Sequence, residues 1–244
     1  MLEYRVLPAG DTALVVEFGD RIDQKLNAAV LALSHGLDAA QIPGITETIP
    51  TFRSLMVHYE PLELTASALV GQIEKQMHNL NTSASVGHVW HLPVCYDPDV
   101  AIDLDDVARR TSLTVQQVVE RHSAPTYHVY MLGFLPGQAY MGEVAPELSL
   151  DRLENPRTQI PAGSLAIASA MSCVFPLETP CGWHVIGRCP IPLWDHGRAT
   201  ALLAPGDKVR FIPVSIREFE TLTTGVSQGA LRLEPISEFV GAAA

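Results

Sequence analysis

Short apolar runs separated by proline and glycine dominate the chain from His88 onward. The runs are Tyr127–Leu132, Leu165–Ala168, Cys173–Phe175, Trp183–Ile186, Ala201–Leu203 and Val209–Ile212. Runs of this length, bounded by residues that end regular structure, are typical of strands rather than helices. The pattern predicts a closed or nearly closed β-barrel. Two short helices interrupt it, one around Leu104–Arg110 with Asp103 as its cap, and one that begins after Thr114 with Gln117 completing a capping box.

The first 80 residues alternate strand and helix instead. Strands are predicted at Ala13–Phe18, Ile45–Ile49 and Ser54–Tyr59. One helix is predicted after the first strand, with Asp20 or Asp23 as its cap, and a second helix after the third strand, with Thr65 as its cap. The order strand, helix, strand, strand, helix predicts a small α+β sandwich that resembles the ferredoxin type. Residues 79–87 are small and polar, so we place a boundary there: an α+β domain at 1–84 and a mainly β domain at 85–244.

Composition excludes several classes of partner. The chain has 244 residues, 47% of them hydrophobic, and a net charge of −11. An acidic chain without a basic run is a poor match for nucleic acid or for an anionic membrane surface. The uncharged stretches His122–Gly142 and Thr158–Leu177 are broken by proline and glycine, which favours buried strands and loops over a membrane span. The start of the chain lacks a signal-peptide pattern, so we expect a cytoplasmic protein.

Common metal, nucleotide and hydrolase motifs are missing from the sequence. Three of the four cysteines are spaced by eight residues, which no zinc pattern uses, and we expect buried, reduced thiols. His88 and His91 would point to opposite faces of a strand, so we expect solvated histidines and no metal site. The sequence contains no GxxxxGK[ST], GxGxxG or GxSxG pattern.

Three segments are too rich in glycine, proline and aromatic or basic residues for ordinary core: Gly133–Gly142, Asn155–Ser164 and Pro180–Arg188. The first predicts a loop with exposed backbone N–H groups that a ligand can approach closely, although a rigid structural turn remains the alternative. The other two each contain one arginine, Arg157 and Arg188, the usual fork for a carboxylate or phosphate.

His122 has two interpretations. It shares the apolar face of its helix with Val115, Val118 and Val119, at the C-terminal end. It is therefore either a core histidine stabilised by the helix dipole, or a general acid/base or donor to a substrate.

These segments resemble one family along nearly the whole chain: the B subunit of prokaryotic ATP-dependent 5-oxoprolinase, a family that also covers allophanate hydrolase subunit 1 and the sporulation-kinase inhibitor KipI. The matching stretches are Gly10–Gly19, Pro43–Ile45, Pro50–Tyr59, His122, Gly133–Gly137, Tyr140–Gly142, Pro156–Arg157, Ile160–Ser164, Gly182–Trp183, Ile186–Arg188 and Gly206–Val209.

The resemblance implies a cyclophilin-like barrel of the carboxyltransferase-subunit type after the α+β domain. It implies a C-type partner of the allophanate hydrolase subunit 2 family and an A-type partner of a different fold, which together open the lactam of 5-oxoproline to glutamate at the expense of ATP. The implied cofactor is ATP with Mg, held mainly by a partner. Such a reaction needs cationic donors and an acid/base, for which our catalytic candidates are His122, Arg157 and Arg188, with backbone N–H groups of Gly133–Gly137 as oxyanion donors. The candidate substrate-binding residues are Gly133, Phe134, Pro136, Gly137, Tyr140, Pro161, Gly163, Ser164 and Trp183.

The chain departs from the family pattern at three places. Ser169–Pro176 replaces Gly-Gly-Gln-Thr-Gly before an aromatic-Pro, Thr179–Trp183 replaces Ser-Pro-Gly-Gly-Trp, and Gln138–Tyr140 replaces Phe-Pro-Tyr. These changes alter hydrogen bonding in loops expected to line the pocket. Two alternatives therefore stay open: a KipI-like inhibitor of a sensor histidine kinase, and a subunit for another small amide on the urea and allophanate pathway.

Overall fold

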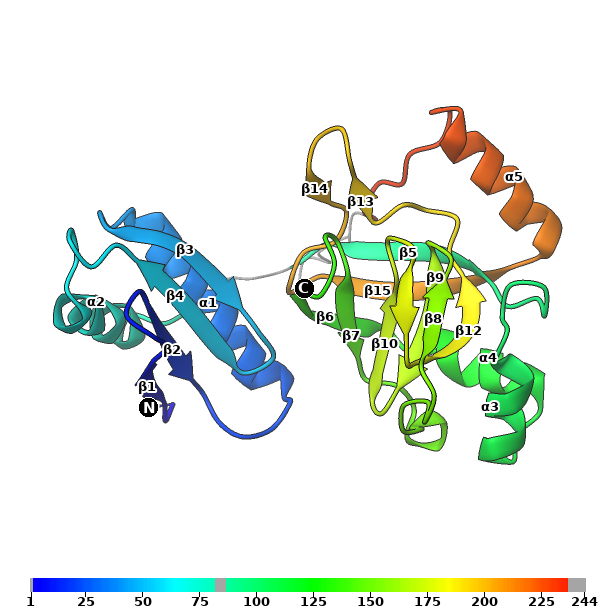
Figure 1. The fold of residues 1–244 in the computed structure, drawn as a ribbon, viewed down its shortest axis with the longest axis horizontal. Helices are drawn as coiled ribbons and strands as arrows, with labels where there is room; N and C mark the ends of the chain where they lie inside the picture. Colours follow the sequence, from blue (N-terminus) through cyan, green and yellow to red (C-terminus); the bar gives the residue numbers. More distant parts are fainter. Residues whose placement is uncertain (1, 82–86, 237–244) are drawn as a thin grey trace, which may run out of the picture. The chain divides into compact units, whose positions relative to one another are not determined.

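The computed structural model describes residues 2–81 and 87–236 and divides into two compact units, Met1–Val86 and Gly87–Ala244. Figure 1 shows both, and each is described by itself. The predicted boundary between residues 84 and 85 lies outside the described residues. Within the described residues, no helix has both the length and the apolar character needed to span a membrane.

The first unit is a two-layer α+β sandwich. Its antiparallel sheet has the order β1 (Arg5–Pro8), β2 (Ala13–Glu17), β4 (Ser54–Tyr59) and β3 (Ile45–Pro50). The helices α1 (Gln24–Ala40) and α2 (Ala66–His78) pack on it through a shared hydrophobic core. A ferredoxin-type unit would place a final strand beside β2 after the second helix. Here β1, which the sequence did not predict, fills that edge from the start of the chain.

Both predicted helix caps of this unit are present. Asp23 accepts hydrogen bonds from Lys25 N at 2.8 Å and Leu26 N at 3.3 Å, which selects it over Asp20 as the cap of α1. Thr65 accepts from Ala68 N at 3.3 Å at the start of α2. Each bond satisfies backbone donors that have no partner within the helix.

The second unit contains a closed seven-stranded barrel, which confirms the predicted barrel and is consistent with a cyclophilin-like one (Figure 1). Around the barrel the strands follow the order β10 (Met171–Val174), β7 (Ala139–Gly142), β6 (Tyr127–Leu132), β15 (Lys208–Val214), β5 (Val89–Cys95), β12 (His184–Arg188) and β9 (Ser164–Ala168). Alternate residues point inward, as the pleat requires, so Leu165, Ile167 and Ile186 belong to the core.

Shorter elements surround the barrel. The helices α3 (Leu104–Thr111) and α4 (Val115–Ser123) and the 3-10 turn η1 (Pro146–Leu148) contact one another, while β8 (Arg157–Ile160) pairs with β11 (Thr179–Cys181). The strands β13 (Trp194–Asp195) and β14 (Thr200–Ala201) form a small hairpin. The predicted capping box of Thr114 and Gln117 is present on α4.

Two expectations for this unit need correction. Asp103 stands at the N-cap position of α3, as predicted, but its side chain makes no capping bond there; it instead bonds Val185 N and Arg157. The chain after Val209 was expected to hold only strands and turns, yet α5 (Ile216–Ser227) follows β15 directly. A capping box of Ser215 and Glu218 begins this helix. The Ser-x-x-Glu signal was therefore present in the sequence.

A buried carboxylate locks the start of β15 against the start of β5. Asp207 is 2% exposed. It accepts hydrogen bonds from Trp90 Nε1 at 2.9 Å, His88 N at 2.8 Å and Ala204 N at 2.9 Å. Removing the carboxylate would leave three donors without their acceptor at the closure of the barrel.

We therefore expect Asp207→Ala to lower the free energy of unfolding of the barrel unit by about 3 kcal/mol or more, in line with the cost of unsatisfied buried donors. Urea unfolding followed by tryptophan fluorescence measures it, since Trp90 lies at this site. The exposed Asp99→Ala is the control, with an expected change of less than about 0.5 kcal/mol. Equal stability of the two variants would show that Asp207 does not contribute to closure.

Candidate functional site

An aromatic group on the barrel wall contains two of the predicted substrate-binding residues, Tyr140 and Trp183. Their ring centroids lie 6.0 Å apart in an edge-to-face arrangement, and Phe175 meets Trp183 in the same way at 6.2 Å. The Arg152 guanidinium lies over the Trp183 ring, 5.9 Å from its centroid. Tyr140 comes from β7 and Trp183 immediately precedes β12, so the barrel brings together residues that are far apart in sequence. The three rings and the Arg152 guanidinium thus pack against one another through aromatic and cation–π contacts.

The departures from the family pattern gather beside this aromatic group. The Gln138 side chain hydrogen-bonds to the Cys173 thiol, and Cys181 Sγ accepts from Trp183 N at 3.2 Å. Gln138 is 1% exposed, and its Oε1 has no hydrogen-bond partner among the described residues. A buried acceptor without a partner has capacity to bond a ligand or a water molecule. Three substitutions that are separate in the sequence thus alter one place in the fold.

Arg157, the first residue of β8, forms an ion pair with Asp103. The same carboxylate accepts from Val185 N at 2.7 Å, and Asp103 N donates to Val185 O at 2.8 Å. The Asp103 side chain is 7% exposed, so it is well shielded from water and holds Arg157 firmly. Arg157 Nη1 has no partner within the described part of the chain. Arg157 is therefore mostly neutralised, with one donor still available.

Arg188 lies at the far end of β12, three residues beyond Val185, or about 10 Å along an extended strand. It lines a cleft of about 230 Å³ together with Gly163, Val174, Pro176 and Phe219 of α5. Arg188 Nε donates to Ala162 O at 3.0 Å, and its guanidinium lies 5.9 Å from the centroid of the Phe219 ring. Arg188 thus ends β12, whereas Arg157 lies on β8 and is connected to Val185, near the start of β12, only through Asp103.

The predicted segment Pro161–Ser164 forms the turn beside Arg188. Gly163 has a φ of +82°, and a Cβ there would lie 2.4 Å from Cys189 O, so only glycine fits. Gly163 N donates to Phe175 O at 2.8 Å, and Ser164 Oγ donates to Pro161 O at 2.7 Å. This turn fixes the wall of the cleft, and the Ser164 hydroxyl proton is already committed.

The Gly133–Gly137 segment is the loop between β6 and β7. Phe134 is 69% exposed with a φ of +69°, and Pro136 is also exposed. Leu135 N donates to Gly133 O at 2.9 Å and Gln138 N to Leu135 O at 3.0 Å, so internal bonds occupy part of the backbone. At Gly137 a Cβ would lie 2.6 Å from Leu193 O. The loop is thus partly the rigid turn that formed the alternative interpretation, with an exposed aromatic at its tip.

His122 lies inside the barrel and is 0% exposed. Its Nδ1 hydrogen-bonds with the Tyr96 hydroxyl at 2.9 Å and its Nε2 with Ser172 Oγ at 3.0 Å, while the ring stacks on Phe211 with centroids 4.9 Å apart. Burial lowers the pKa of His122 to about 3. These contacts favour the core interpretation, and an acid/base role for His122 stays a prediction.

Sequence reasoning missed several residues that the structure brings to these places. Asp103 was interpreted as a helix cap because it directly precedes a predicted helix. No neighbouring residue in the sequence indicated its ion pair with Arg157. Arg152 and Phe175 carried no separate signal.

All four cysteines are free and buried, and burial raises the pKa of the Cys189 thiol to about 12.

The chain matches the family model of the carboxyltransferase domain, subdomain C and D, over residues 4–204, and it belongs to this family. Among its curated relatives, the B subunit of 5-oxoprolinase from Bacillus subtilis is 31% identical over 230 residues, covering 89% of this chain and 96% of that protein. The B subunit of 5-oxoprolinase from Escherichia coli O157:H7 is 33% identical over 205 residues, covering 84% and 93%.

A solved structure supports the fold over almost the whole chain. The Kluyveromyces lactis urea amidolyase superposes with a TM-score of 0.79 over 96% of this chain and 16% of that much longer protein. Its sequence identity is 20%, so it supports the fold alone.

Because burial favours the neutral imidazole, His122 makes stability depend on pH. Between a pKa of about 6.5 in the unfolded chain and about 3 in the folded one, the unfolded state binds the extra proton. The free energy of unfolding therefore falls as pH drops below about 6.5, by up to about 1.4 kcal/mol per pH unit from this group. We expect His122→Gln to show a shallower fall between pH 6.5 and 4.5 in urea titrations.

The exposed His35→Gln is the control and should leave the unfolding of the barrel unit unchanged, because His35 belongs to the other unit. A wild-type slope in His122→Gln, or a His122 imidazole NMR signal that titrates near pH 6.5, would contradict the buried neutral ring.

Proposed function

We propose that this chain is the B-type subunit of an ATP-dependent amide hydrolase that opens 5-oxoproline to glutamate. The observation that carries the proposal is the similarity of 31–33% over most of the chain to proteins named as the B subunit of 5-oxoprolinase. The match to the carboxyltransferase family model, over residues 4–204, includes Tyr140, Trp183 and Arg188.

The chemistry of the Arg188 cleft supports a small, anionic cyclic amide as substrate. 5-Oxoproline is a five-membered lactam with one carboxylate. The Arg188 cleft, at about 230 Å³, has room for a molecule of that size and offers it a half-exposed guanidinium. Gln138 and Arg157 do not line this cleft and are not assigned to the substrate.

A lactam is a stable amide, so its opening at neutral pH is helped by phosphorylation of the amide oxygen, which creates a better leaving group. Phosphorylation develops negative charge that guanidinium and backbone N–H donors stabilise. In this proposal Arg188 holds the carboxylate and the Gly133–Gly137 loop contributes backbone donors near the reacting amide. Arg157 stays paired with Asp103 as a rigid support.

The nucleotide does not fit this chain well. The sequence has no phosphate-binding loop, and the described residues hold no cluster of three metal-ligating side chains for Mg. We therefore assign ATP and Mg, and with them the supply of the phosphoryl group, mainly to a partner subunit. The proposal needs a C-type subunit of the allophanate hydrolase subunit 2 family and an A-type subunit. Such partners are supported by the relatives, since each is named as one subunit of a larger enzyme.

The test is a purified complex of the tagged chain with its C-type and A-type partners, assayed for ATP-dependent formation of glutamate from 5-oxoproline. We expect Arg188→Ala to lower kcat/KM by about 10- to 100-fold, the loss expected for a hydrogen bond to a charged group. Arg188→Lys should retain part of the wild-type kcat/KM, because the positive charge stays but the bidentate hydrogen-bonding geometry of the guanidinium is lost. Solubility should be unchanged, since Arg188 is half-exposed.

Arg217→Ala is the control, because Arg217 is an exposed arginine of α5 that does not line the cleft. Full activity in Arg188→Ala would remove Arg188 from the site. A complex that forms but makes no glutamate would point to another small amide, with urea-type substrates tested next. Recovery of a histidine kinase without a C-type partner would favour the inhibitor alternative.

A further inference from the structure

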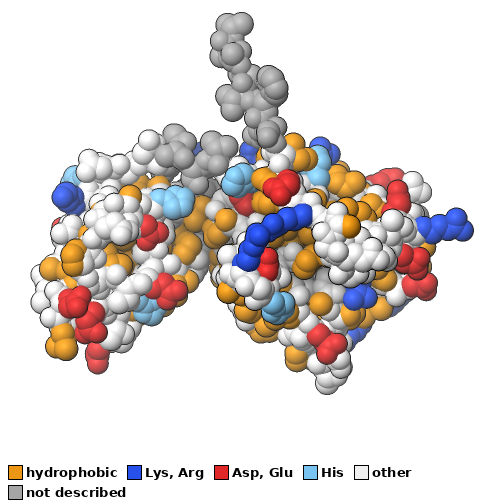
Figure 2. Space-filling view, turned by 90° about the horizontal axis from the view of Figure 1, so that it is seen from above, with side chains coloured by type: hydrophobic (Ala, Val, Ile, Leu, Met, Phe, Trp, Pro, Cys, Tyr) orange, Lys and Arg blue, Asp and Glu red, His pale blue; other side chains and the backbone are white. Residues whose placement is uncertain are grey.

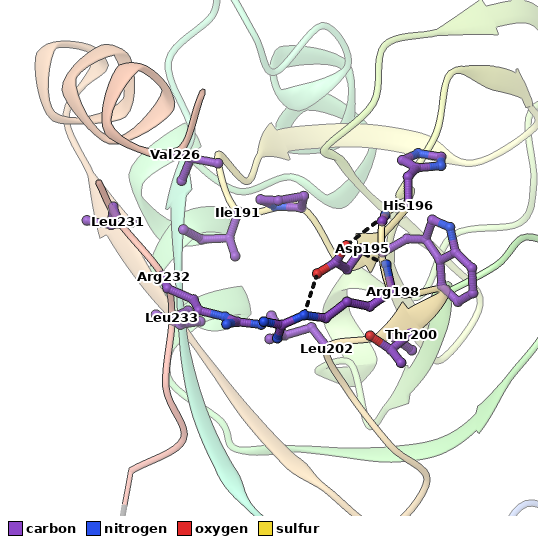
Figure 3. Close-up of a pocket in the computed structure, with 14 residues that line it drawn as sticks. Ile191, Asp195, His196, Arg198, Thr200, Leu202, Val226, Leu231, Arg232 and Leu233 are labelled. Atoms are coloured by element: carbon purple, nitrogen blue, oxygen red, sulfur yellow. Dashed lines mark hydrogen bonds and ion pairs between the residues drawn. The ribbon is translucent and has the colours of Figure 1, made fainter. Parts of the chain in front are cut away.

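A second hollow of the barrel unit lies beside the β13–β14 hairpin, and nothing in the proposed function uses it. We call it the hairpin pocket. It measures about 590 Å³, within the usual range of ligand sites. One wall is the hairpin, and the other is formed by the end of α5 and the segment that follows it (Figure 3). It shares Ile191, Pro192 and Val226 with the Arg188 cleft, but Arg188 itself does not line it.

Two arginines reach into the hairpin pocket from its opposite walls. Arg198 comes from the hairpin and Arg232 from the segment after α5, and their side chains extend toward one another (Figure 3). Two guanidiniums that converge repel each other unless an anion lies between them. This arrangement is unusual in a chain whose net charge is −11.

The carboxylate nearest to them neutralises only part of this charge. Asp195 Oδ1 accepts from Gly197 N at 2.9 Å and Arg198 N at 3.1 Å, and Asp195 Oδ2 lies 3.9 Å from Arg198 Nε. Within residues 2–81 and 87–236, Arg232 forms no ion pair. One acid for two arginines leaves a net positive pocket that favours a single negative charge.

The remaining lining is mostly aliphatic. Ile191 is buried, and Leu202, Val226, Leu231 and Leu233 are partly buried against the barrel core. In the space-filling view the barrel unit shows basic side chains lying across an area of hydrophobic ones (Figure 2). An apolar floor below a cationic rim matches a molecule with an apolar body and one anionic end.

We propose that the hairpin pocket binds an organic monocarboxylate with an aliphatic body. Arg198 and Arg232 hold the carboxylate, and the aliphatic residues contact the body. A bare inorganic anion would leave the apolar floor unused, and a neutral molecule would leave the two guanidiniums facing each other. The site needs both parts of the ligand.

The test uses octanoate as the probe and the full chain, with 1-octanol as the neutral analogue and acetate as the carboxylate without a body. Methyl-labelled protein allows the resonances of Ile191, Leu202 and Leu233 to be followed by NMR during each titration. We expect octanoate to shift these methyl signals with an affinity at least about tenfold above that of 1-octanol or acetate, as expected when a charge-assisted bond is added to apolar contact.

Arg198→Gln and Arg232→Gln should each weaken octanoate binding by about tenfold and leave 1-octanol binding unchanged. Arg217→Gln, which removes the same charge from the exposed face of α5, is the matched control and should bind octanoate as the wild type does. All three arginines are exposed, so folding should be retained, which circular dichroism checks.

Equal affinity for octanoate and 1-octanol, or undiminished octanoate binding in both pocket variants, would overturn the proposal. So would inorganic phosphate or ATP binding that shifts the same methyl signals as strongly as octanoate, because that would make this a phosphate site. None of these outcomes depends on glutamate formation by the complex, so the test is separate from that of the proposed function.

Discussion

The parallel pairing of β5 with β15 closes the barrel, and the position of the Arg188 cleft depends on it. The pairing runs from Lys208 opposite Val89 to Val214 opposite Cys95. Cys95 also pairs with Arg188 on its other side. The end of β15, the end of β5 and Arg188 are therefore neighbours, and α5, which begins two residues after β15, starts beside Arg188. This register explains why Phe219 of α5 lies on the Arg188 guanidinium.

Much of the barrel was predictable because its strands are buried and apolar, and proline and glycine mark where they end. β7 was missed for another reason: the segment Gly133–Gly142 was predicted to be a loop, yet Ala139–Gly142 forms a buried barrel strand despite its glycine-rich neighbourhood. The other missed elements lack the burial signal. β1 is mostly exposed and gains its stability from pairing with β2 rather than from a buried face. α5 buries only Phe219, so its apolar stripe is weak, although its capping box was visible. Patterns of hydrophobicity report burial, and elements with little burial need other signals.

The candidate site was predictable as a set of segments but not as an arrangement. In the sequence, Arg157 and Arg188 look equivalent, since each directly follows a proline or a glycine. The fold puts them on different strands, Arg157 on β8 and Arg188 at the end of β12, and Asp103, 54 residues before Arg157, neutralises Arg157. A long-range ion pair of this kind depends on tertiary contacts that no local spacing encodes. His122 shows the same limit, because only the closed barrel supplies Tyr96 and Ser172 to its two nitrogens.

A guanidinium serves an anionic ligand only as far as the protein has not already neutralised it. Arg5 and Arg53 both pair with Glu17, and Arg157 pairs with Asp103. Arg188 instead donates to a carbonyl and lies over a ring, and neither contact cancels its charge. Of Arg198 and Arg232, only Arg198 pairs with a carboxylate within the described residues, that of Asp195. These three arginines line hollows that have Val226 of α5 in common. In an acidic chain, the side of the barrel under α5 is thus one place where positive charge remains available to small anions.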